Sequence, residues 1–464
     1  MVGNGPVRLP PVDTVVLSAS PGEQRAAVLR GGAVWGLDWE WPDRPSRVGA
    51  VFAVRVTRLA PEAKGAFVVT DERGSEGFLD LSRQRGPLPH EGQRLLAQAT
   101  RLPEDGKRLT LSPAIRLAGR YLVYTPGHAG VSASRQLPKA AAGPLQGVVK
   151  RTLRPDESAI VRAAAAALAD AAERLLPELE RHRAAWQALT GTSGLGLLRA
   201  APLLAERLLL ERSGTGPLTV IADSPRAQSA ARAAAAAWAP GEPVTVTLDS
   251  ANPFECRGGE EAMAQAAARH APLRSGGGLW LEPTRAGWMA DVDSGSGQGS
   301  AAALRLQTNL EAAVELARQV RLRQASGLFV TDFLRLANKG EEERVLQTLR
   351  AAFAEDPAPL RFNPAFDPLG FYAFSRGRVA PAFASRLDAG GHAQTLLAGL
   401  RGLVRDALAE PHRRLALHLS PAAVEAAGAM PVALREAEAV LGAPPRLEPD
   451  SALRPGQFAV RPQA

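Results

Sequence analysis

The sequence predicts a multidomain α+β protein, and three observations indicate this fold class. The chain has 464 residues, which at about 100–200 residues per domain indicates several folding units. Short β-rich runs separated by turns fill the chain up to Leu111, whereas residues 156–210 are rich in helix-forming residues. Hydrophobic residues make up 45% of the chain and charged residues 22%, so enough apolar material is present to bury a core.

The first segment, residues 14–41, predicts a three-stranded meander. Pro21-Gly22 and Gly31-Gly32 separate its strands, and both pairs are typical of tight turns. Residues 48–111 contain about five further short strands, with turns that hold Gly, Asp and Lys. This spacing is typical of a small closed barrel of the OB type, a fold that often binds single strands of nucleic acid.

Two aromatic residues, Phe67 and Phe78, fall in adjacent predicted strands of this barrel. In an RNA-binding barrel they would stack bases, and Lys107 would reach a phosphate. Most phenylalanines in strands are buried, however, so the pattern alone favours a place in the core for both.

The region after the barrel predicts a strand and a loop over residues 121–138 and another strand over 146–153. Four basic residues of this region could form a phosphate site, although solvated loop charges are the more frequent outcome for such a set. They are Arg135, Lys150, Arg151 and Arg154.

Helices are expected from Asp156 to Leu210, with Pro155 just before the first helix and a break at Thr190-Gly191. Residues 219–249 then predict a strand–helix–strand unit, because an alanine-rich run separates two short apolar runs.

Three aspartates lie at strand ends in the segment that follows. Residues 276–283 and 287–293 predict two strands joined by a short turn, and alternation places Asp291 and Asp293 on one face of the second strand. A helix follows, and then a strand that ends at Asp332. Carboxylates at the C-terminal ends of two strands that one helix connects are well placed to meet at a sheet edge.

Oxygen ligands of this kind suit Mg²⁺ or Mn²⁺ better than zinc. Aspartates at strand ends are also frequent turn formers, so the spacing alone supports a metal site and a turn about equally. Three arginines near the end of the helix, Arg318, Arg321 and Arg323, could bind phosphate or be solvated charges.

Charge and composition exclude several classes of protein. Lysine and arginine total 55 against 47 acidic residues, and the net charge of +8 favours a polyanionic partner. The single cysteine, Cys256, excludes an intramolecular disulfide and a Cys-rich zinc site, and it fits a reducing compartment. The N-terminal residues lack the features of a signal peptide, and no apolar run approaches the length of a membrane span. We therefore expect a soluble cytoplasmic protein without membrane contact.

Several segments, in order, resemble the ribonuclease E/G family of bacterial endoribonucleases. The resemblance covers nearly the whole chain, and the combination of DVDSG, TNLEAA and VTDF is highly specific. It is carried by SASPGEQRAAVLRGG, VGAVFAVRVTRL, KGAFVVTDERGSEGFLDL, LAGRYLVYTPGHAGVS, LRSGGGLWLEPTRAGWMADVDSGSG, QTNLEAAVELARQVRLRQASGLFVTDF and LGFYAFSRGRV.

The resemblance implies five parts along the chain. These are an RNase H-like layer formed by residues 1–47 and 203–266, an OB-fold RNA-binding barrel inserted at 48–116, a sensor of the RNA 5′ monophosphate at 117–202, a DNase I-like catalytic layer at 267–388 and a small C-terminal α/β domain at 389–464.

The resemblance also implies roles for individual residues. Asp291 and Asp332 match the two aspartates that hold a catalytic magnesium ion in the family. Asp293 stands where the family usually has an asparagine that orients the site, so it would add a metal ligand or raise the local negative charge. Phe67 and Phe78 match the base-stacking aromatics of the barrel, and the resemblance therefore favours RNA contact over burial for both.

The sensor of the family is matched in part. Arg151 and Thr152 match its arginine and threonine, and Arg135 is a further phosphate contact. Its second arginine is best matched by Arg361, at a spacing from Asp332 that is a residue or two too long. The two-cysteine zinc link that joins protomers in the family is absent, so we expect no structural zinc and no zinc-bridged dimer.

The resemblance thus implies a magnesium-dependent endoribonuclease that acts on single-stranded RNA and leaves 5′-phosphate and 3′-hydroxyl ends. Its role would be the processing of ribosomal or other RNA precursors, or message decay. Two further hypotheses stay open. Asp293 and the missing cysteines motivate a non-catalytic RNA-binding paralogue, and Asp291-Val-Asp293 is also compatible with the D-x-D metal site of a nucleotide-sugar glycosyltransferase.

Overall fold

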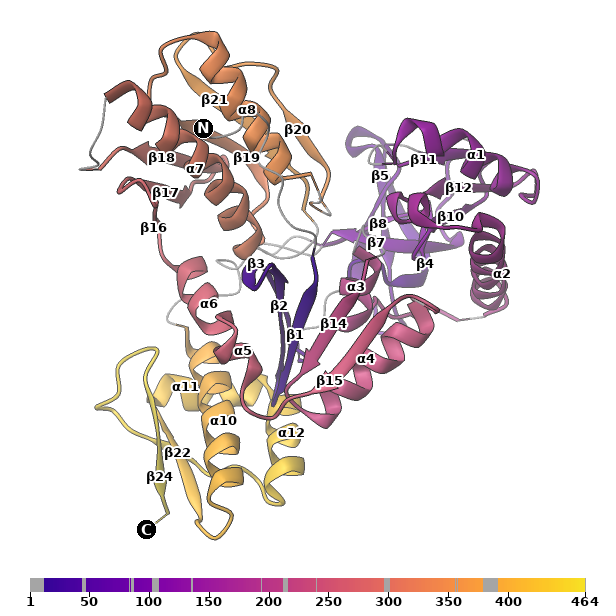
Figure 1. Cartoon of the computed structure of the whole chain (residues 1–464). Helices are drawn as coiled ribbons and strands as arrows, with labels where there is room; N and C mark the ends of the chain where they lie inside the picture. The colour runs from indigo at the N-terminus through magenta and orange to yellow at the C-terminus, as the bar shows by residue number, and fades with distance from the viewer. Residues whose placement is uncertain are drawn as a thin grey trace. The chain divides into compact units, whose positions relative to one another are not determined.

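The computed structural model shows a mixed α+β protein, as predicted (Figure 1). It describes residues 12–43, 47–82, 84, 87–101, 108–134, 137–192, 194–211, 216–238, 240–295, 301–354, 356, 358–378 and 391–463. The chain forms two compact units. The first consists of Met1–Pro45, Leu218–Ala231 and Thr245–Ala464, and the second of Ser46–Pro217 and Arg232–Val244.

The predicted meander and the predicted strand–helix–strand segment form one sheet of the first unit, in the order β15-β14-β1-β2-β3. Gly22, in the first turn, adopts a φ of 72°, which favours glycine, and a Cβ there would lie 2.3 Å from that of Ala433. The strands are β1 (Thr14–Ser20), β2 (Glu23–Arg30), β3 (Ala33–Glu40), β14 (Leu218–Ala222) and β15 (Val244–Leu248). The helices that follow them are α4 (Pro225–Trp238), α5 (Pro253–Cys256) and α6 (Gly259–Ala267).

The second sheet of the first unit carries the three aspartates, and its strand order is β16-β17-β18-β19-β21-β20. Helices α7 and α8 cover one face of it (Figure 1), where residues such as Trp288, Phe329, Leu316 and Val345 are buried together. The strands are β16 (His270–Pro272), β17 (Gly278–Pro283), β18 (Trp288–Asp293), β19 (Gly327–Asp332), β20 (Leu360–Phe362) and β21 (Phe371–Arg376). The helices are α7 (Ala301–Leu322) and α8 (Lys339–Ala352).

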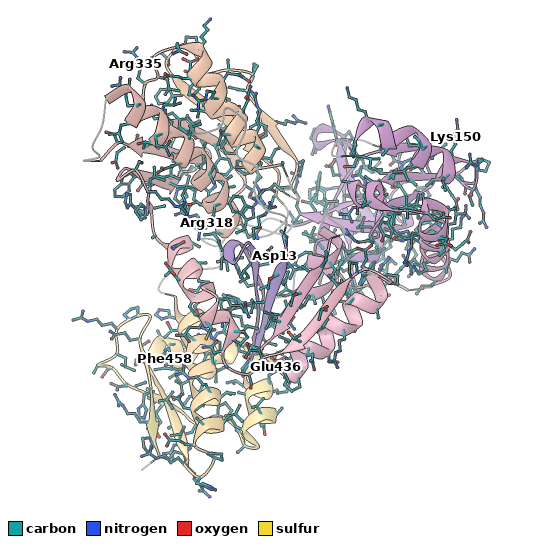
Figure 2. The ribbon with its side chains drawn as sticks, viewed as in Figure 1. Asp13, Lys150, Arg318, Arg335, Glu436 and Phe458 are labelled. Carbon is teal, nitrogen blue, oxygen red and sulfur yellow. The ribbon has the colours of Figure 1, made fainter. Side chains whose placement is uncertain are left out.

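The interpretation of the three arginines at the end of α7 as solvated charges was wrong for Arg321 and Arg323, and all three side chains contact protein groups. Arg318 donates to the carbonyl of Val34 on β3 (Figure 2). Arg321 and Arg323 are buried: Arg321 pairs with Asp356 at 3.0 Å, and Arg323 donates to main-chain carbonyls. Burial lowers the pKa of both arginines to about 10. The end of α7 packs between two sheets, a tertiary contact that helical periodicity does not reveal.

The C-terminal residues of the first unit form a three-stranded sheet in the order β23-β22-β24, with α10 packed on it. Its apolar core includes Leu396, Leu400, Leu417 and Met430. The elements are α10 (His392–Ala409), β22 (Leu415–Leu419), α11 (Pro421–Ala426), η3 (Ala427–Ala429), α12 (Pro431–Leu441), β23 (Leu447–Pro449) and β24 (Phe458–Pro462).

The second unit contains the predicted barrel. Described strands β4, β5, β6, β8 and β7 follow one another, and pairing of β4 with β7 closes the ring around buried residues such as Phe52, Val68 and Leu111. This order is consistent with an OB fold. The elements are β4 (Val51–Ala60), η1 (Pro61–Ala63), β5 (Gly65–Val69), β6 (Glu76–Asp80), β7 (Arg94–Arg101) and β8 (Leu109–Ser112), and β13 (Gly196–Arg199) pairs with β4 outside the ring.

A second sheet of this unit has the order β11-β12-β10-β9, and α1 and α2 pack on it. Its strands are β9 (Leu117–Ala118), β10 (Leu122–Pro126), β11 (Gly130–Ala133) and β12 (Glu157–Val161). Its helices are α1 (Lys139–Lys150), η2 (Ala163–Ala167) and α2 (Ala171–Thr190), and α3 (Leu204–Glu211) follows β13 along the chain. Among the described residues of the whole chain, no helix is both long and apolar enough to cross a membrane.

Two of the predicted elements in this region were wrong. Residues 146–153 are not a strand, because α1 runs to Lys150 and buries Leu145 and Val149, four residues apart, on one helix face. The residues after Pro155 are not a helix but strand β12, whose alternate side chains are buried. Helix α2 begins only at Ala171, where the Asp170 carboxylate accepts main-chain hydrogen bonds as N-cap, and it ends at Thr190 as predicted.

A buried ion pair connects α2 to the segment between α1 and β12. Arg183 on α2 donates from Nε to Glu157 Oε1 at 2.8 Å and from Nη2 to the carbonyl of Thr152 at 2.7 Å. Tyr124 Oη and the main-chain N–H of Arg154 also donate to Glu157. Burial alone would raise the pKa of Glu157, but these hydrogen bonds and the Arg183 charge lower it to about 2.

We predict that Glu157→Gln lowers the free energy of unfolding at pH 7 by about 3 kcal/mol, because the folded carboxyl titrates near 2 and the unfolded one near 4.5. The stabilisation is present above the unfolded pKa and is lost as the pH falls toward 2. The difference between wild type and variant should therefore shrink between pH 7 and pH 3 in urea unfolding followed by circular dichroism.

The matched control is Glu180→Gln, since Glu180 pairs with the same Arg183 but its side chain is 61% exposed. It should cost less than about 1 kcal/mol. An equal loss for Glu157→Gln at pH 7 and pH 3 would contradict the role given to its charge.

Candidate functional site

Asp291 and Asp332 lie side by side on the exposed face of the β16–β21 sheet. Strands β18 and β19 are parallel, and the two aspartates are direct register partners. Both side chains are exposed. The structure thus places together the two carboxylates that the strand pattern predicted to meet.

Alternation along β18 determines which face carries the carboxylates. Trp288, Ala290 and Val292 are buried in the core beneath α7 and α8. Asp291 and Asp293 occupy the intervening exposed positions, as the sequence predicted. A shift of one residue in register would bury both carboxylates, so the apolar residues of β18 determine the position of the site.

Two residues of α7 hold the chain segments around the aspartates. Asn309 is fully buried; its Nδ2 donates to the carbonyl of Leu334 at 2.7 Å, and Leu334 N–H donates back to its Oδ1 at 3.0 Å. This pair of bonds holds the chain two residues after Asp332. Glu311 accepts a hydrogen bond from the main-chain N–H of Ser275, before β17, at 2.8 Å. Both lie in the TNLEAA segment.

The three aspartates form a patch of uncompensated negative charge. Burial, the charge of Asp332 and the charge of Asp293 raise the pKa of Asp291, in that order of size. Within the described ranges, no lysine or arginine forms an ion pair with any of the three. A divalent cation between Asp291 and Asp332 would relieve this repulsion, and carboxylate oxygens are ligands that Mg²⁺ and Mn²⁺ prefer.

Asp293 has a structural function in addition to its charge. Its Oδ1 accepts a hydrogen bond from Gly295 N–H at 2.9 Å, and Gly295 adopts a φ of 57°. The side chain therefore forms the turn that ends β18. In the part of the chain that the structure describes, no group of three or more His, Cys, Asp and Glu residues is arranged to hold a metal ion. Asp291 and Asp332 are two neighbouring carboxylates on one exposed sheet face.

On the barrel, Phe67 and Phe78 form a second candidate surface. They are register partners on β5 and β6, with ring centroids 5.8 Å apart and an edge-to-face angle of 71°. Both are half-buried and lie outside the buried barrel core. Lys107 lies outside the described residues.

Two arginines that the sequence analysis missed flank this aromatic pair. The guanidinium carbons of Arg58 and Arg108 lie 4.6 and 5.2 Å from the centroid of the Phe67 ring. Arg58 is the register partner of Phe67 on β4, a cross-strand neighbour that only the pairing of the strands reveals. Arginine side chains beside half-buried aromatic rings are suited to bind a polyanion that carries aromatic groups.

The predicted sensor residues occupy different parts of the fold. Arg151 is exposed at the C-terminal end of α1, next to Lys150 (Figure 2), and the Thr152 carbonyl is held by Arg183. Arg361 is exposed on β20 in the first unit, whereas Arg151 and Thr152 belong to the second. Their convergence on one phosphate stays a prediction, and Arg135 lies outside the described residues.

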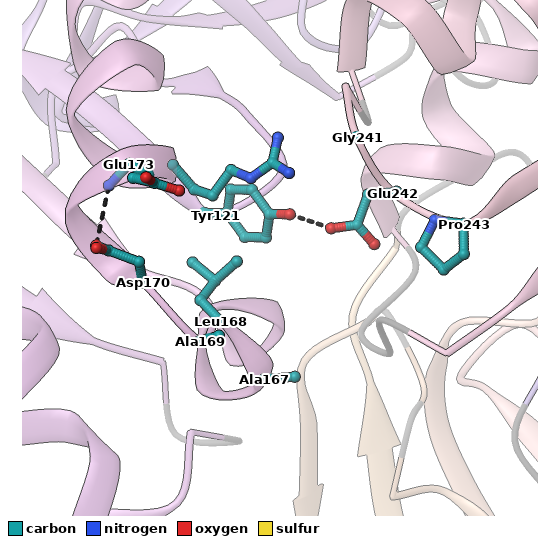
Figure 3. Close-up of a pocket in the computed structure, with 10 residues that line it drawn as sticks. Tyr121, Ala167, Leu168, Ala169, Asp170, Glu173, Gly241, Glu242 and Pro243 are labelled. Atoms are coloured by element: carbon teal, nitrogen blue, oxygen red, sulfur yellow. Dashed lines mark hydrogen bonds between the residues drawn. The ribbon is translucent and has the colours of Figure 1, made fainter.

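A cavity of about 270 Å³ in the second unit involves none of the predicted residues (Figure 3). Tyr121 Oη donates a hydrogen bond to Glu242 across it, and Arg174 donates to the carbonyl of Pro240. Burial, followed by the contact with Glu242, raises the pKa of Tyr121. Since Asp170 caps α2, the polar groups of this cavity make contacts within the fold, and the cavity is not part of the candidate site.

Comparison with known proteins gives a match to one family and to several individual relatives. Residues 116–379 match the model of the ribonuclease E/G family. Ribonuclease G of Salmonella typhimurium (strain SL1344) is 25% identical over 396 residues, covering 79% of this chain and 80% of that protein. Ribonuclease G of Escherichia coli (strain K12) is 26% identical over 79% of this chain and 80% of that protein. Ribonuclease E of Escherichia coli (strain K12) is 26% identical over 78% of this chain but 36% of its own length.

Proposed function

The chain belongs to the ribonuclease E/G family, and from this membership we propose that it is a magnesium-dependent endoribonuclease that cleaves single-stranded RNA. The observation that carries the proposal is the in-register pair Asp291–Asp332 on an exposed sheet face. The products would have 5′-phosphate and 3′-hydroxyl ends, and the role would be processing of ribosomal or other RNA precursors or message decay. The five-part division of the chain given above belongs to the same proposal.

Asp291 and Asp332 would hold the magnesium ion, and Mn²⁺ fits the same oxygen ligands. The bound ion would supply Lewis acidity and stabilise charge at the scissile phosphate. Asn309 keeps the Asp332 strand end in place through its two bonds to Leu334. Asp293 would strengthen the negative potential at Asp291 while its side chain forms the turn after β18.

The barrel would bind the RNA strand. Phe67 and Phe78 are half-exposed and would stack on bases, and Arg58 places positive charge beside them; Arg108 is paired with Glu76 at 2.6 Å. Lys107 would contact a phosphate. The net charge of +8 supports a polyanionic substrate for the chain as a whole.

The 5′ monophosphate of the substrate would bind Arg151, Thr152, Arg361 and Arg135. Planar guanidiniums donate two parallel hydrogen bonds to a phosphate, which makes such contacts strong. Cys256 is the single cysteine of the chain, so any dimer would form without a two-cysteine zinc link.

One observation favours the alternative of a non-catalytic RNA-binding paralogue. Asp293 replaces the usual asparagine, and its carboxylate is engaged by Gly295 N–H. Such a paralogue would bind RNA through the barrel without cleaving it. The family match removes the support for a nucleotide-sugar glycosyltransferase, since the D-x-D pattern then has a place in a nuclease site.

Asp291→Asn and Asp332→Asn should each reduce cleavage of single-stranded RNA by about 100-fold or more while sparing binding, because each removes one metal-holding carboxylate. Neither variant should be less stable, since loss of one charge relieves the repulsion at Asp291. Initial rates with a labelled A/U-rich oligonucleotide, with and without Mg²⁺, measure the effect. Glu282→Gln is the control, because Glu282 is exposed on the adjacent strand and pairs with Arg269.

Near wild-type turnover in both aspartate variants would remove these residues from catalysis. A wild-type chain that binds the oligonucleotide but does not cleave it with Mg²⁺ or Mn²⁺ would establish the non-catalytic alternative.

Phe67→Ala and Phe78→Ala should each weaken single-stranded RNA binding by about 1–3 kcal/mol, the value of one lost base stack. Because both rings lie outside the barrel core, the variants should keep the wild-type circular dichroism spectrum. Fluorescence anisotropy with a labelled oligonucleotide gives the affinity. Phe52→Ala is the contrasting control, since Phe52 is 5% exposed inside the barrel and its truncation should cost about 3–5 kcal/mol of stability. Unfolding of either surface variant would instead assign that ring to the core.

RNA with a 5′ monophosphate should be cleaved at least about tenfold faster than the same RNA with a 5′ hydroxyl, the value of one charge-assisted contact. Arg151→Ala and Arg361→Ala should each erase most of that preference and leave the rate on the hydroxyl substrate nearly unchanged. Lys139→Ala, at the opposite end of α1 from Arg151, should keep the preference. Equal rates on both substrates in the wild type would show that the sensor is not functional. A preference that survives Arg361→Ala would exclude that arginine.

A further inference from the structure

Five side chains form a row across the β16–β21 sheet, and the carboxylate pair lies inside it. The register partners are His270 with Trp280, Trp280 with Asp291, Asp291 with Asp332, and Asp332 with Phe371. Register partners of neighbouring strands project from the same sheet face. Aromatic rings therefore flank the two carboxylates on both sides, Trp280 on one and Phe371 on the other.

Trp280 is unusually exposed for an indole. Its relative exposure is 43%, whereas Trp288, on the opposite face of the same sheet, is 9% exposed in the core. The ring of His270 lies against it, with centroids 4.7 Å apart, and supports one side of the indole. Met289, on the neighbouring strand, is also 45% exposed. Exposed apolar surface of this kind beside a polar site marks a binding surface.

We propose that Trp280 is a stacking platform for the nucleobase next to the phosphate that is cleaved, and that Phe371 offers a second platform on the other side. The proposal rests on the proposed function and adds a specificity-determining residue to it. A base on Trp280 would leave its phosphate about one strand spacing, roughly 5 Å, from the carboxylates. Since every base has a π-face, this platform tolerates all four bases and favours those that stack strongly.

The cost of desolvation favours RNA over a protein as the occupant of this surface. A protein that covered Trp280 and Met289 would also cover Asp291, whose charge has no ion-pair partner among the described residues, and desolvating it would be costly. A nucleobase contacts only the ring and brings with it the phosphate whose cleavage these carboxylates serve. The aromatic row therefore fits a single strand that crosses the sheet.

The test measures binding of the full chain, with Ca²⁺ in place of Mg²⁺, to a single-stranded oligonucleotide whose cleavage site has been mapped beforehand with Mg²⁺. A series of oligonucleotides carries one abasic nucleotide at each position around that site. The variants are Trp280→Ala, Trp280→Phe and Trp280→Leu, and the control is Leu408→Ala, an exposed apolar residue on α10 in the C-terminal part. Thermal unfolding and light scattering accompany each variant.

Wild type should lose at least about fivefold in affinity when the base beside the cleaved phosphate is missing, the lower end of one base stack. Trp280→Ala and Trp280→Leu should bind the intact RNA at least about fivefold more weakly and lose sensitivity to that abasic position. Trp280→Phe should retain both properties to within about threefold, because it keeps a ring. Leu408→Ala should match wild type.

Three results would overturn the proposal while leaving the proposed function intact. The first is a wild type that cleaves RNA yet is insensitive to abasic positions beside the cut. The second is a Trp280→Leu variant that binds RNA as well as Trp280→Phe does. The third is a Trp280 variant with a changed oligomeric mass and unchanged RNA binding, which would assign the face to a protein contact. The abasic series on the wild type needs no variant, so a misfolded Trp280→Ala does not decide the outcome. A wild type that neither binds nor cleaves RNA would instead refute the proposed function itself.

Discussion

The parallel pairing of β18 with β19 is the constraint on which the candidate site depends. The buried residues of α7 hold the crossover between these strands, and the register then fixes Asp291 beside Asp332. Two carboxylates in this position repel each other, and the repulsion contributes to the raised pKa of Asp291. The core beneath the sheet sustains this unfavourable arrangement, because moving either aspartate would require the apolar face of its strand to leave the core.

Buried and exposed charges have different roles in this protein. Glu157 and Arg183 are buried, hydrogen-bonded and matched in charge, and the hydrogen bond from Arg183 to the Thr152 carbonyl fixes the segment that carries Arg151. A matched buried pair of this kind fixes geometry. The aspartates of the sheet are exposed and unmatched, so they can accept a cation. The charges on the barrel surface fall between the buried pair and the exposed aspartates. Arg58 and Arg108 lie over the Phe67 ring, and both remain accessible.

Local sequence patterns predicted the features whose cause is local. Glycine turns marked the meander, alternation placed Asp291 and Asp293 on one face, and the order of strand, helix and strand brought Asp332 to them.

The errors arose where packing outweighed propensity. Val148 and Val149 favour a strand locally, yet α1 forms because Leu145 and Val149 can be buried together against the sheet. Residues 157–161 became a strand because β10 and β11 flank them. Cross-strand register makes Arg58 a neighbour of Phe67 and Trp280 a neighbour of Asp291. A short stretch of sequence does not contain this register, so neither neighbour could be predicted.

The turn after β18 bears on the residue at position 293, where the family resemblance implies an asparagine and this chain has an aspartate. Asparagine and aspartate both carry a side-chain oxygen that accepts a hydrogen bond from the main chain two residues ahead, and Asp293 makes this bond to Gly295. The turn after β18 therefore tolerates either residue. What differs is charge: the carboxylate adds to the negative potential at Asp291 and raises its pKa further. The Asp293 carboxylate thereby strengthens the attraction of the Asp291 oxygens for a proton and for a divalent cation alike. The two compete for these oxygens. A carboxylate at position 293 acts on both charges of a divalent cation but on the single charge of a proton, so relative to an asparagine it favours cation binding over protonation at Asp291 and Asp332, while the sheet that positions them stays the same.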